Sequence, residues 1–381
     1  MNEDQTSAPT LAEMMSHDQA RVESLQHRLR IDSDRNDIKD SKATLPAKPG
    51  RSIGSDYYIV GVTLPAKPGQ SIGSGNYVVT CYKQQEPIFN PSASQSYKNL
   101  ICNTPQCSQL LRKGYTRATN TCLYGVLYGD RSYTIRLFAT ETLTLIPYTS
   151  NFFPDFAFGC GLNNTGLFCG AAGLLGLGHG PPSFVAQITS TCGRYFSYCL
   201  PTLSSSSGTL GFGIGGGTRN SACIKYTPWL TNSNGPSFYF MEVLGIKVAG
   251  ELLPINQSVF SSSGTIIDSG TVITRLQPKV YDALRTRFRQ LMMNYIDTCY
   301  DFNDRETVEV PTISFVFGGN VEVPMPFPGI LIGSQELACL AFLGNSDASD
   351  MGIFGNSQQQ TLDVVYDVAG GKLGFGTGGC S

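Results

Sequence analysis

The run Gly264-Thr-Ile-Ile-Asp268-Ser-Gly-Thr271 holds the most informative local signal in this 381-residue chain. A short apolar strand ends in an aspartate, which is followed by a hydroxyl residue and a glycine. A turn of this kind can hold a carboxylate among backbone N–H groups, with the hydroxyls of Ser269 and Thr271 beside it. Asp-Ser-Gly is also an ordinary turn, so the interpretation depends on the apolar residues before it and on what accompanies it elsewhere.

Two further elements share the pattern of two apolar residues followed by a glycine. The first is Leu174-Leu175-Gly176, and the second is Ile353-Phe354-Gly355, which lies 87 residues after Asp268 when counted to its glycine. The pair forms a second signal beside the Asp268 turn.

The composition outside the N-terminal region is typical of an all-β protein. Residues 1–43 contain 15 of the 56 charged residues, and the remainder is rich in Gly, Ser, Thr and aromatic residues. Short β-like runs at 156–159, 238–248, 307–310 and 361–366 alternate with turn signals. Helices are expected over 11–30, with Met15, Val22, Leu25 and Leu29 near one face, and over 278–292, where Pro278 suits a helix start.

Together these motifs resemble the pepsin-like aspartic peptidases, within their plant nepenthesin-like branch. The resemblance runs from about Gly73 to Ser381, and Tyr128-Gly129-Asp-Arg-Ser132 resembles the flap hairpin. It implies an all-β, bilobal fold, a pepsin-like double β-barrel with an interlobe cleft. Residues 14–30 resemble the family's pro-segment.

The resemblance also implies four regions and an activity. We expect a pro-segment-like helical region at 1–43, a tandem repeat and linker at 44–75, an N-terminal lobe with the flap at 76–232, and a C-terminal lobe at 233–381. The family activity is aspartic endopeptidase action, the acid-pH hydrolysis of peptide bonds by an Asp-activated water. Asp268 would be the catalytic residue, and Ser269, Gly270, Thr271, Tyr128 and Gly129 would contact the substrate or support the carboxylate.

The chain departs from the family where the first Asp-Thr-Gly is expected. Thr80 joins Cys81 directly, no Asp-Thr-Gly occurs anywhere, and Asp268 begins the single Asp-Ser-Gly. The N-terminal lobe is therefore expected to be incomplete. Two carboxylates about 3 Å apart share one proton, so that one activates water while the other supplies an acid. A chain with Asp268 alone is expected to be impaired in hydrolysis.

The same sequence features are compatible with two other functions. Plant inhibitors of microbial xylanases share the branch and lack a working dyad, so the chain could be a non-catalytic pseudo-peptidase that binds or inhibits a secreted glycoside hydrolase. A homodimer that pairs two copies of Asp268 is a third possibility, but the N-terminal lobe would obstruct it. We expect a monomer that holds a polypeptide in the interlobe cleft.

No cofactor or metal is expected. The run Gly211-Phe-Gly-Ile-Gly-Gly216 fits a dinucleotide-binding pattern, but no helix follows it. The twelve cysteines include no Cys-x-x-Cys, and no His stands at zinc-ligand spacing from them. The near-neutral net charge of −2 gives no reason to expect nucleic acid, and no apolar run is long enough to span a membrane.

The cysteines indicate an oxidising compartment. A set of disulfides, with Cys299–Cys339 implied by the resemblance, is expected in an extracellular or vacuolar protein, and the alternative is twelve buried thiols. Two sequons, at Asn163 and Asn256, fit secretion. The polar N-terminus shows no signal peptide. A 19-residue repeat, in which Thr44–Ser55 recurs as Thr63–Ser74, precedes the incomplete lobe.

Overall fold

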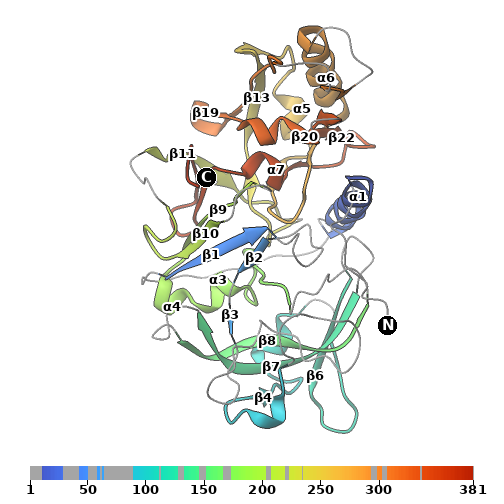
Figure 1. Ribbon diagram of the computed structural model, residues 1–381. Coiled ribbons are helices and arrows are strands. Elements are labelled where there is room, and N and C mark those ends of the chain that lie inside the picture. The colour runs from blue at the N-terminus through green and yellow to red at the C-terminus, as the bar shows by residue number, and fades with distance from the viewer. Residues whose placement is uncertain are drawn as a thin grey trace, which may run out of the picture. The chain divides into compact units, whose positions relative to one another are not determined.

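The computed structural model describes most of the chain (Figure 1). The described residues are 11–28, 43–49, 58–60, 62–63, 89–110, 113–127, 133–145, 152–165, 173–202, 207–218, 223–233, 235–292, 298–302, 307–334 and 337–380. Its architecture is mostly β with few helices, which confirms the expected fold class. No helix among these residues is long and apolar enough to cross a membrane.

The chain divides into two compact units. Unit 1 comprises Met1–Leu25, Asp34–Phe196 and Ser206–Gly217, and unit 2 comprises Gln26–Ser33, Ser197–Ser205 and Thr218–Ser381. Strand β9 (Tyr195–Cys199) contains the point at which the chain passes from the first to the second. The domain limits expected from the sequence remain predictions.

Unit 1 is built on a six-stranded sheet around the long strand β7. Strand β7 pairs with β3, β4, β6 and β8, and β6 pairs with β5. Separately, β1 pairs with β2 and β10. The strands are β1 (Ala43–Pro49), β2 (Tyr58–Val60), β3 (Val62–Thr63), β4 (Lys98–Asn99), β5 (Lys113–Tyr115), β6 (Cys122–Leu127), β7 (Tyr133–Leu145), β8 (Phe152–Thr165) and β10 (Gly208–Phe212).

Strand β7 is buried over much of its length, which fits its place at the centre of this sheet. Residues 138–141 are buried without a break, and half-buried and buried residues alternate from Thr142 to Leu145. The helical segments of the unit are short apart from α1 (Leu11–Arg28), whose last three residues, from Gln26, belong to unit 2. The others are η2 (Pro91–Ala93), α2 (Pro105–Ser108), α3 (Phe184–Gln187) and α4 (Thr189–Cys192). The predicted N-terminal helix is confirmed, although Met14 rather than Met15 is the buried methionine of its apolar face.

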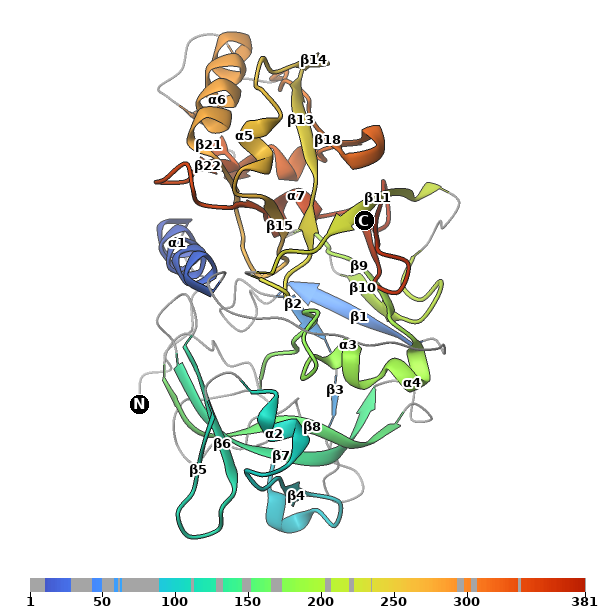
Figure 2. The same ribbon diagram turned by 180° about the vertical axis from the view of Figure 1, so that it is seen from behind.

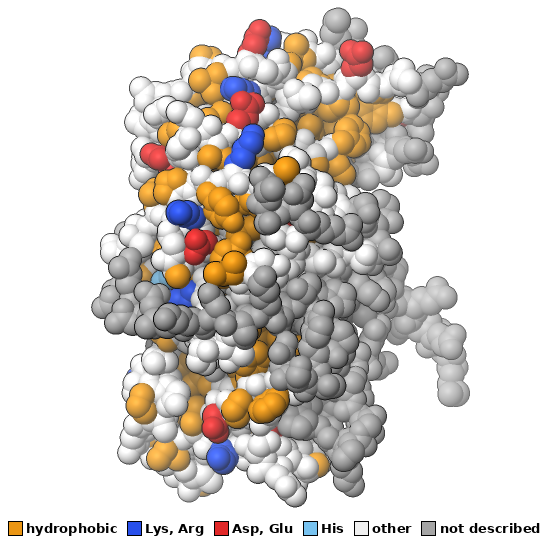
Figure 3. Space-filling view, turned by 90° about the vertical axis from the view of Figure 1, so that its left-hand side faces the viewer, with side chains coloured by type: hydrophobic (Ala, Val, Ile, Leu, Met, Phe, Trp, Pro, Cys, Tyr) orange, Lys and Arg blue, Asp and Glu red, His pale blue; other side chains and the backbone are white. Residues whose placement is uncertain are grey.

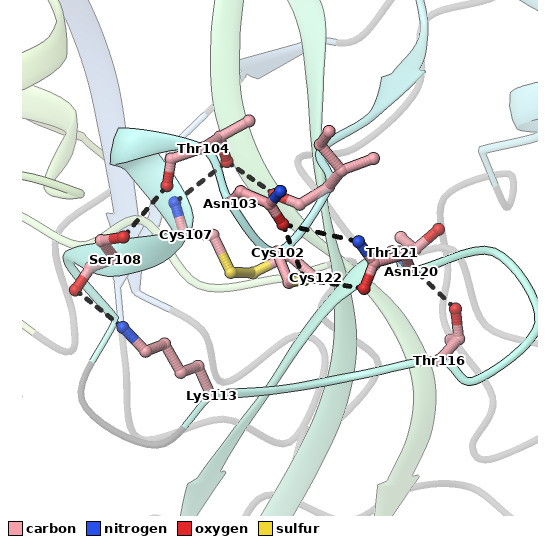
Figure 4. Close-up of a disulfide and its surroundings, with 11 residues drawn as sticks. Cys102, Asn103, Thr104, Cys107, Ser108, Lys113, Thr116, Asn120, Thr121 and Cys122 are labelled. Atoms are coloured by element: carbon pink, nitrogen blue, oxygen red, sulfur yellow. Dashed lines mark hydrogen bonds between the residues drawn. A yellow bond between two sulfur atoms is a disulfide. The ribbon is translucent and has the colours of Figure 1, made fainter.

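A disulfide anchors the loop region beside β6. Cys107 of α2 is bonded to Cys122 at the start of β6 (Figure 4). The backbone N–H of Cys122 donates to Leu100 O at 2.7 Å. The side chain of Thr104 accepts from the N–H of Cys107 and begins the short helix. Figure 4 shows Cys102 on the neighbouring segment, where its thiol contacts Asn120 Oδ1 at 2.8 Å.

Unit 2 contains three groups of strands. One follows the order β24-β25-β11-β12-β15-β23-β16-β22, the second β14-β13-β18-β19, and the third β17-β21-β20. The strands are β11 (Lys225–Leu230), β12 (Phe240–Met241), β13 (Val243–Val248), β14 (Glu251–Leu252), β15 (Thr265–Ile267), β16 (Thr274–Leu276), β17 (Cys299–Tyr300), β18 (Ile313–Phe317), β19 (Val321–Pro324), β20 (Leu331–Gly333), β21 (Ala338–Leu340), β22 (Phe342–Gly344), β23 (Gly352–Phe354), β24 (Asp363–Asp367) and β25 (Lys372–Gly376).

Stacked and edge-to-face phenylalanines form the core of unit 2. The rings of Phe317 and Phe375 stack with their centres 5.1 Å apart, and Phe354 meets Phe315 edge-to-face at 5.2 Å. All four side chains are at most 2% exposed. Phe354 therefore ties strand β23 into the core, and each aromatic pair adds about 0.5–1.5 kcal/mol beyond its burial.

The helices of unit 2 are α5 (Ser258–Ser261), α6 (Pro278–Met292) and α7 (Asn356–Gln359), with the short turns η4 (Gly318–Asn320) and η5 (Phe327–Gly329). Helix α6 confirms the helix predicted over 278–292, and its apolar face contacts β13 and β22 (Figure 2). The run predicted as a strand over 238–248 divides into β12 and β13, which join different sheets.

One predicted strand is wrong. Residues Thr307–Val310 have no regular structure, and β18 begins only at Ile313. Pro311 explains the difference, because proline cannot donate to a strand ladder and restricts the residue before it.

Disulfides within unit 2 join segments far apart in sequence. Cys299 is bonded to Cys339, as the family resemblance implies, and Cys199 is bonded to Cys380 across 181 residues. The alternative that all twelve cysteines are buried thiols is therefore wrong.

Charged side chains are sparse on the described surface. On the face seen in Figure 3, basic and acidic side chains stand near one another among uncharged and apolar ones. Lys247 Nζ and Glu322 Oε2 form an ion pair and lie 2.5 Å apart. The hydrogen bond from Lys247 is the main reason that the pKa of Glu322 is lowered.

Candidate active site

Asp268 directly follows a buried central strand of unit 2. Strand β15 lies between β12 and β23, and Ile266 and Ile267 are at most 5% exposed. The chain leaves the sheet at Asp268, which is half-buried, and turns through Ser269 and Gly270. The apolar residues thus bury the strand, and the polar residues follow directly after its C-terminal end.

Two hydrogen bonds hold the Asp268 carboxylate. The backbone N–H of Gly270 donates to Oδ1 at 3.2 Å, and the hydroxyl of Thr271 donates to Oδ2 at 2.6 Å. Thr271 is fully buried, so its hydroxyl has a fixed position. Both bonds favour the ionised carboxylate, because a charged acceptor makes the stronger bond.

The second apolar-apolar-Gly element interlocks with this turn. Strand β23 runs parallel to β15, and the N–H of Asp268 donates to Phe354 O at 3.1 Å. Beyond β23, the side chain of Asn356 donates to Ser269 O at 3.1 Å, and its backbone N–H donates to Thr271 O at 2.7 Å. The two sequence motifs are therefore parts of one structure, although 87 residues separate Asp268 from Gly355.

Gly355 is required by the close approach of two backbones. A Cβ at this position would lie 2.8 Å from the carbonyl carbon of Ile273 and 2.9 Å from the nitrogen of Thr274. Backbone atoms cannot move aside as a flexible side chain can. The glycine of the motif thus lets the strand that supports Asp268 cross the segment that follows it.

The corresponding element of unit 1 lacks such a partner among the described residues. Leu174 is 43% exposed, whereas Ile353 and Phe354 are fully buried. A Cβ added to Gly176 would meet no described atom within 4 Å. Residues 173–177 form no strand. Among the described residues, the two elements therefore differ in how closely they are packed.

The predicted flap residues Tyr128 and Gly129 lie outside the described residues, and so do Thr80 and Cys81. The strands on either side of the flap region are described: β6 and β7 pair antiparallel, with Leu127 opposite Tyr133. The roles proposed for Tyr128 and Gly129 therefore remain predictions.

Sequence reasoning missed a buried polar cluster beneath the Asp268 turn. Tyr198, Gln359 and Tyr366 are each at most 4% exposed. Gln359 Nε2 donates to Phe354 O at 2.8 Å, the same carbonyl that Asp268 uses. The run of three glutamines at 358–360, close behind Gly355, could have signalled this cluster, because glutamine is rarely buried without a specific partner.

Burial strongly perturbs the hydroxyl of Tyr366. Its pKa is raised well above 10, first by burial and then by the neighbouring Tyr198, with smaller contributions from Tyr239 and the charge of Asp268. Tyr366 therefore keeps its proton throughout the acidic and neutral range.

Family models match most of the chain. A model described as the N-terminal part of xylanase inhibitors matches residues 70–214, and one described as the C-terminal part matches residues 238–377.

The chain is also similar to plant proteins named as aspartyl proteases. An aspartyl protease family protein of Arabidopsis thaliana is 43% identical over 407 aligned positions, covering 100% of this chain and 85% of its own length. Aspartic proteinase nepenthesin-1 of Nepenthes gracilis is 34% identical, covering 79% of this chain and 70% of its own. Basic 7S globulin from soybean has a similar fold, with a TM-score of 0.69 at 21% identity, covering 89% of this chain and 95% of its own. The chain therefore belongs to the pepsin-like aspartic peptidase family of plants, in which the nepenthesins are among its relatives.

Proposed function

We propose that the fold encodes an aspartic-type endopeptidase that hydrolyses peptide bonds of polypeptides at acidic pH, and that hydrolysis is impaired in this chain. The observation that carries the proposal is the Asp268 turn, in which Gly270 and Thr271 donate hydrogen bonds to the two carboxylate oxygens at the end of a buried strand. The many relatives named aspartyl proteases support the same activity.

Asp268 would act on water as half of a carboxylate pair. An ionised Asp268 can accept a proton from a water molecule as that water attacks the scissile carbonyl. Gly270 and Thr271 would keep its two oxygens oriented, and Ser269 would lie at the surface of the turn. Tyr128 and Gly129 would cover the substrate from the flap. No metal ion or covalent intermediate is required by this chemistry.

The impairment follows from the missing second carboxylate. A carboxyl group that keeps its proton polarises the substrate carbonyl and then protonates the leaving amine. Removing an acid–base group of this kind typically costs about 10²–10⁴-fold in rate. The exposed side chain of Leu174 supports the view that unit 1 lacks the segment which would supply that group.

Three versions of the full chain would test the proposal. The first is the chain as written, the second carries Asp268→Asn, and the third carries a family Asp-Thr-Gly segment between Thr80 and Cys81. We expect acid proteolysis of a denatured protein substrate from the third version alone, with Asp268→Asn abolishing it in that background. Activity of the chain as written above its Asp268→Asn control would contradict the impairment. A folded third version without activity would contradict the peptidase assignment.

A binding function is the second candidate. The two matching family models are described as the N-terminal and C-terminal parts of xylanase inhibitors. A protein that only binds its partner needs no second carboxylate. In this case the chain would inhibit a secreted glycoside hydrolase such as a xylanase. Inhibition should then be equal for the chain as written and for Asp268→Asn, whereas no inhibition over a panel of microbial xylanases would exclude that partner class.

We further propose an extracellular or vacuolar location and a monomeric state. The three disulfides support an oxidising compartment. Fusion of a fluorescent protein to the C-terminus of the product of the complete gene would test the location.

A further inference from the structure

A continuous chain of buried polar side chains leads to the backbone of Asp268. It begins at Tyr366 in β24, passes through Tyr198 in β9 and ends at Gln359 in α7. The three side chains are 4%, 3% and 0% exposed. Burying three polar groups is unfavourable unless each finds a partner, so their arrangement requires a reason.

The direction of each hydrogen bond follows from Gln359. Its Nε2 donates to Phe354 O at 2.8 Å, and its Oε1 accepts from the Tyr198 hydroxyl. The opposite orientation of the amide would place two carbonyl oxygens against each other. Because Tyr198 donates its proton to Gln359, its oxygen is left to accept, and the Tyr366 hydroxyl at 3.0 Å is the donor.

This series of hydrogen bonds ends at the carbonyl oxygen of Phe354, which also accepts the backbone N–H of Asp268. Phe354 O receives both Gln359 Nε2 and the backbone N–H of Asp268, the latter at 3.1 Å. A carbonyl oxygen has two lone pairs, and both are used here. Gln359 therefore fixes the carbonyl oxygen of Phe354, which accepts the backbone N–H of Asp268. Hydrogen bonds that follow one another in a series, as here, strengthen one another.

The protonation of the cluster suits an acidic site. The pKa of Tyr366 lies well above 10, chiefly because of burial, so the first donor of the chain is present at every pH at which a carboxylate works. Tyr239 packs against the Tyr366 ring edge-to-face with ring centres 4.7 Å apart, and Trp229 packs against Tyr239. These aromatic contacts hold the phenol in place.

We infer that Tyr366, Tyr198 and Gln359 form a positioning relay that fixes the backbone of Asp268 and thereby aims its carboxylate at the Gly270 and Thr271 donors. The inference rests on the role proposed for Asp268 and deepens it. Because the relay reaches Asp268 through Phe354 O, its three residues are positioning residues and not catalytic ones.

Residues outside the relay supply controls. Gln187 of α3 also pairs its amide with backbone groups: its Oε1 accepts the N–H of Ala157 at 2.7 Å, and its Nε2 donates to Ala157 O at 2.9 Å. Tyr300 is a buried tyrosine of β17. Gln359→Met and Tyr366→Phe break the relay, whereas Gln187→Met and Tyr300→Phe remove an amide and a phenol hydroxyl outside it.

The readout is the titration of the Asp268 carboxyl itself, followed by carbon NMR on the full chain labelled in its aspartate side chains. Asp268→Asn identifies the resonance by its loss. We expect the pKa of Asp268 to rise in Gln359→Met and, by less, in Tyr366→Phe, because a displaced turn weakens the bonds to the ionised form. Gln187→Met and Tyr300→Phe should leave it unchanged, even where thermal unfolding shows that they destabilise the fold.

Three results would overturn the relay: an unchanged Asp268 titration in both relay variants, equal shifts in relay and control variants, or a shift that follows loss of stability. Tyr366→Phe keeps the shape of the side chain, so it stays informative if Gln359→Met does not fold. The titration needs no turnover. A relay effect in a protein without proteolysis would therefore uphold the relay while counting against the proposed function.

Discussion

The side-chain amide of Gln26 pairs with both backbone groups of Met351. Gln26 Nε2 donates to Met351 O at 2.9 Å, and the N–H of Met351 donates to Gln26 Oε1 at 3.0 Å. Glutamine here imitates the pairing of a neighbouring strand. Met351 directly precedes β23, the strand that supports the Asp268 turn, so a residue of the N-terminal helix contacts the approach to the candidate site.

Replacing Gln26 should loosen this attachment. In Gln26→Ala the amide of Met351 loses its hydrogen-bond acceptor, and we expect its hydrogen exchange to become faster than in the unchanged chain. Gln19→Ala is the control, because Gln19 is on the same helix and bonds Glu23 within it. Equal protection of Met351 in all three proteins would show that the pairing is not stable in solution.

The two apolar-apolar-Gly elements should respond differently to an added methyl group. Gly355→Ala places a Cβ 2.8 Å from backbone atoms, so we expect a loss of about 1–3 kcal/mol in the free energy of unfolding. Gly176→Ala meets open space among the described atoms and should change stability by less than about 0.5 kcal/mol. Urea unfolding measures both. Equal losses would mean that Gly176 is packed as tightly as Gly355.

Thr271→Val should destabilise the protein in a pH-dependent way. The Thr271 hydroxyl donates to the charged form of Asp268, and such bonds contribute about 1.5–3 kcal/mol. We expect the loss of stability to be largest where Asp268 is ionised and to shrink as acid protonates it. Ser269→Ala, at the half-buried neighbouring hydroxyl, should change little. Urea midpoints measured from acidic to neutral pH give the comparison, and a pH-independent loss would mean that only packing was changed.

The Lys247–Glu322 pair should contribute stability at neutral pH alone. The pKa of Glu322 is lowered chiefly by its hydrogen bond from Lys247, so the folded state binds its proton less readily than the unfolded state. The contribution is present above the unfolded pKa of Glu322 and is lost as pH falls through the lower folded value. Both side chains are about one-third exposed, at 31% and 40%, so Lys247→Met should cost at most about 1 kcal/mol. Thermal unfolding at neutral and strongly acidic pH would show the difference, and an equal effect at both would refute the ionic origin.

Of the two sequons, Asn256 is expected to carry a glycan if the chain enters the secretory pathway. Asn256 is exposed, and its Oδ1 accepts the N–H of Ser258 in the turn before α5. Asn163 pairs within the β7–β8 ladder, beside the fully buried Asn164. After secretory expression, Asn256→Gln should lower the mass by one glycan, and Asn163→Gln should not. The reverse pattern would contradict the exposure seen here.

Much of the fold and of the candidate site could be predicted from local sequence. The apolar run before Asp268 predicts a buried strand, and the residues Ser269 to Thr271 predict a turn that can hold a carboxylate. The regular apolar face of residues 278–292 specifies α6. These features depend on neighbours in sequence, so periodicity and residue type suffice to recognise them. The prediction of a strand at Thr307–Val310 was wrong for a local reason too, because Pro311 disfavours strand pairing at this position.

Only the tertiary structure decided which distant residues meet. Tyr198 and Tyr366 lie 168 residues apart, yet their hydroxyls are in hydrogen-bond contact beneath Asp268. Likewise, Gln26 reaches Met351, and Leu174 is exposed while Ile353 is buried. Such contacts depend on how strands from separate parts of the chain pair and pack, and no local pattern encodes that pairing. The sequence by itself established Asp268 as a turn aspartate, whereas the packing of β15 against β23 and α7 determined what holds it in place.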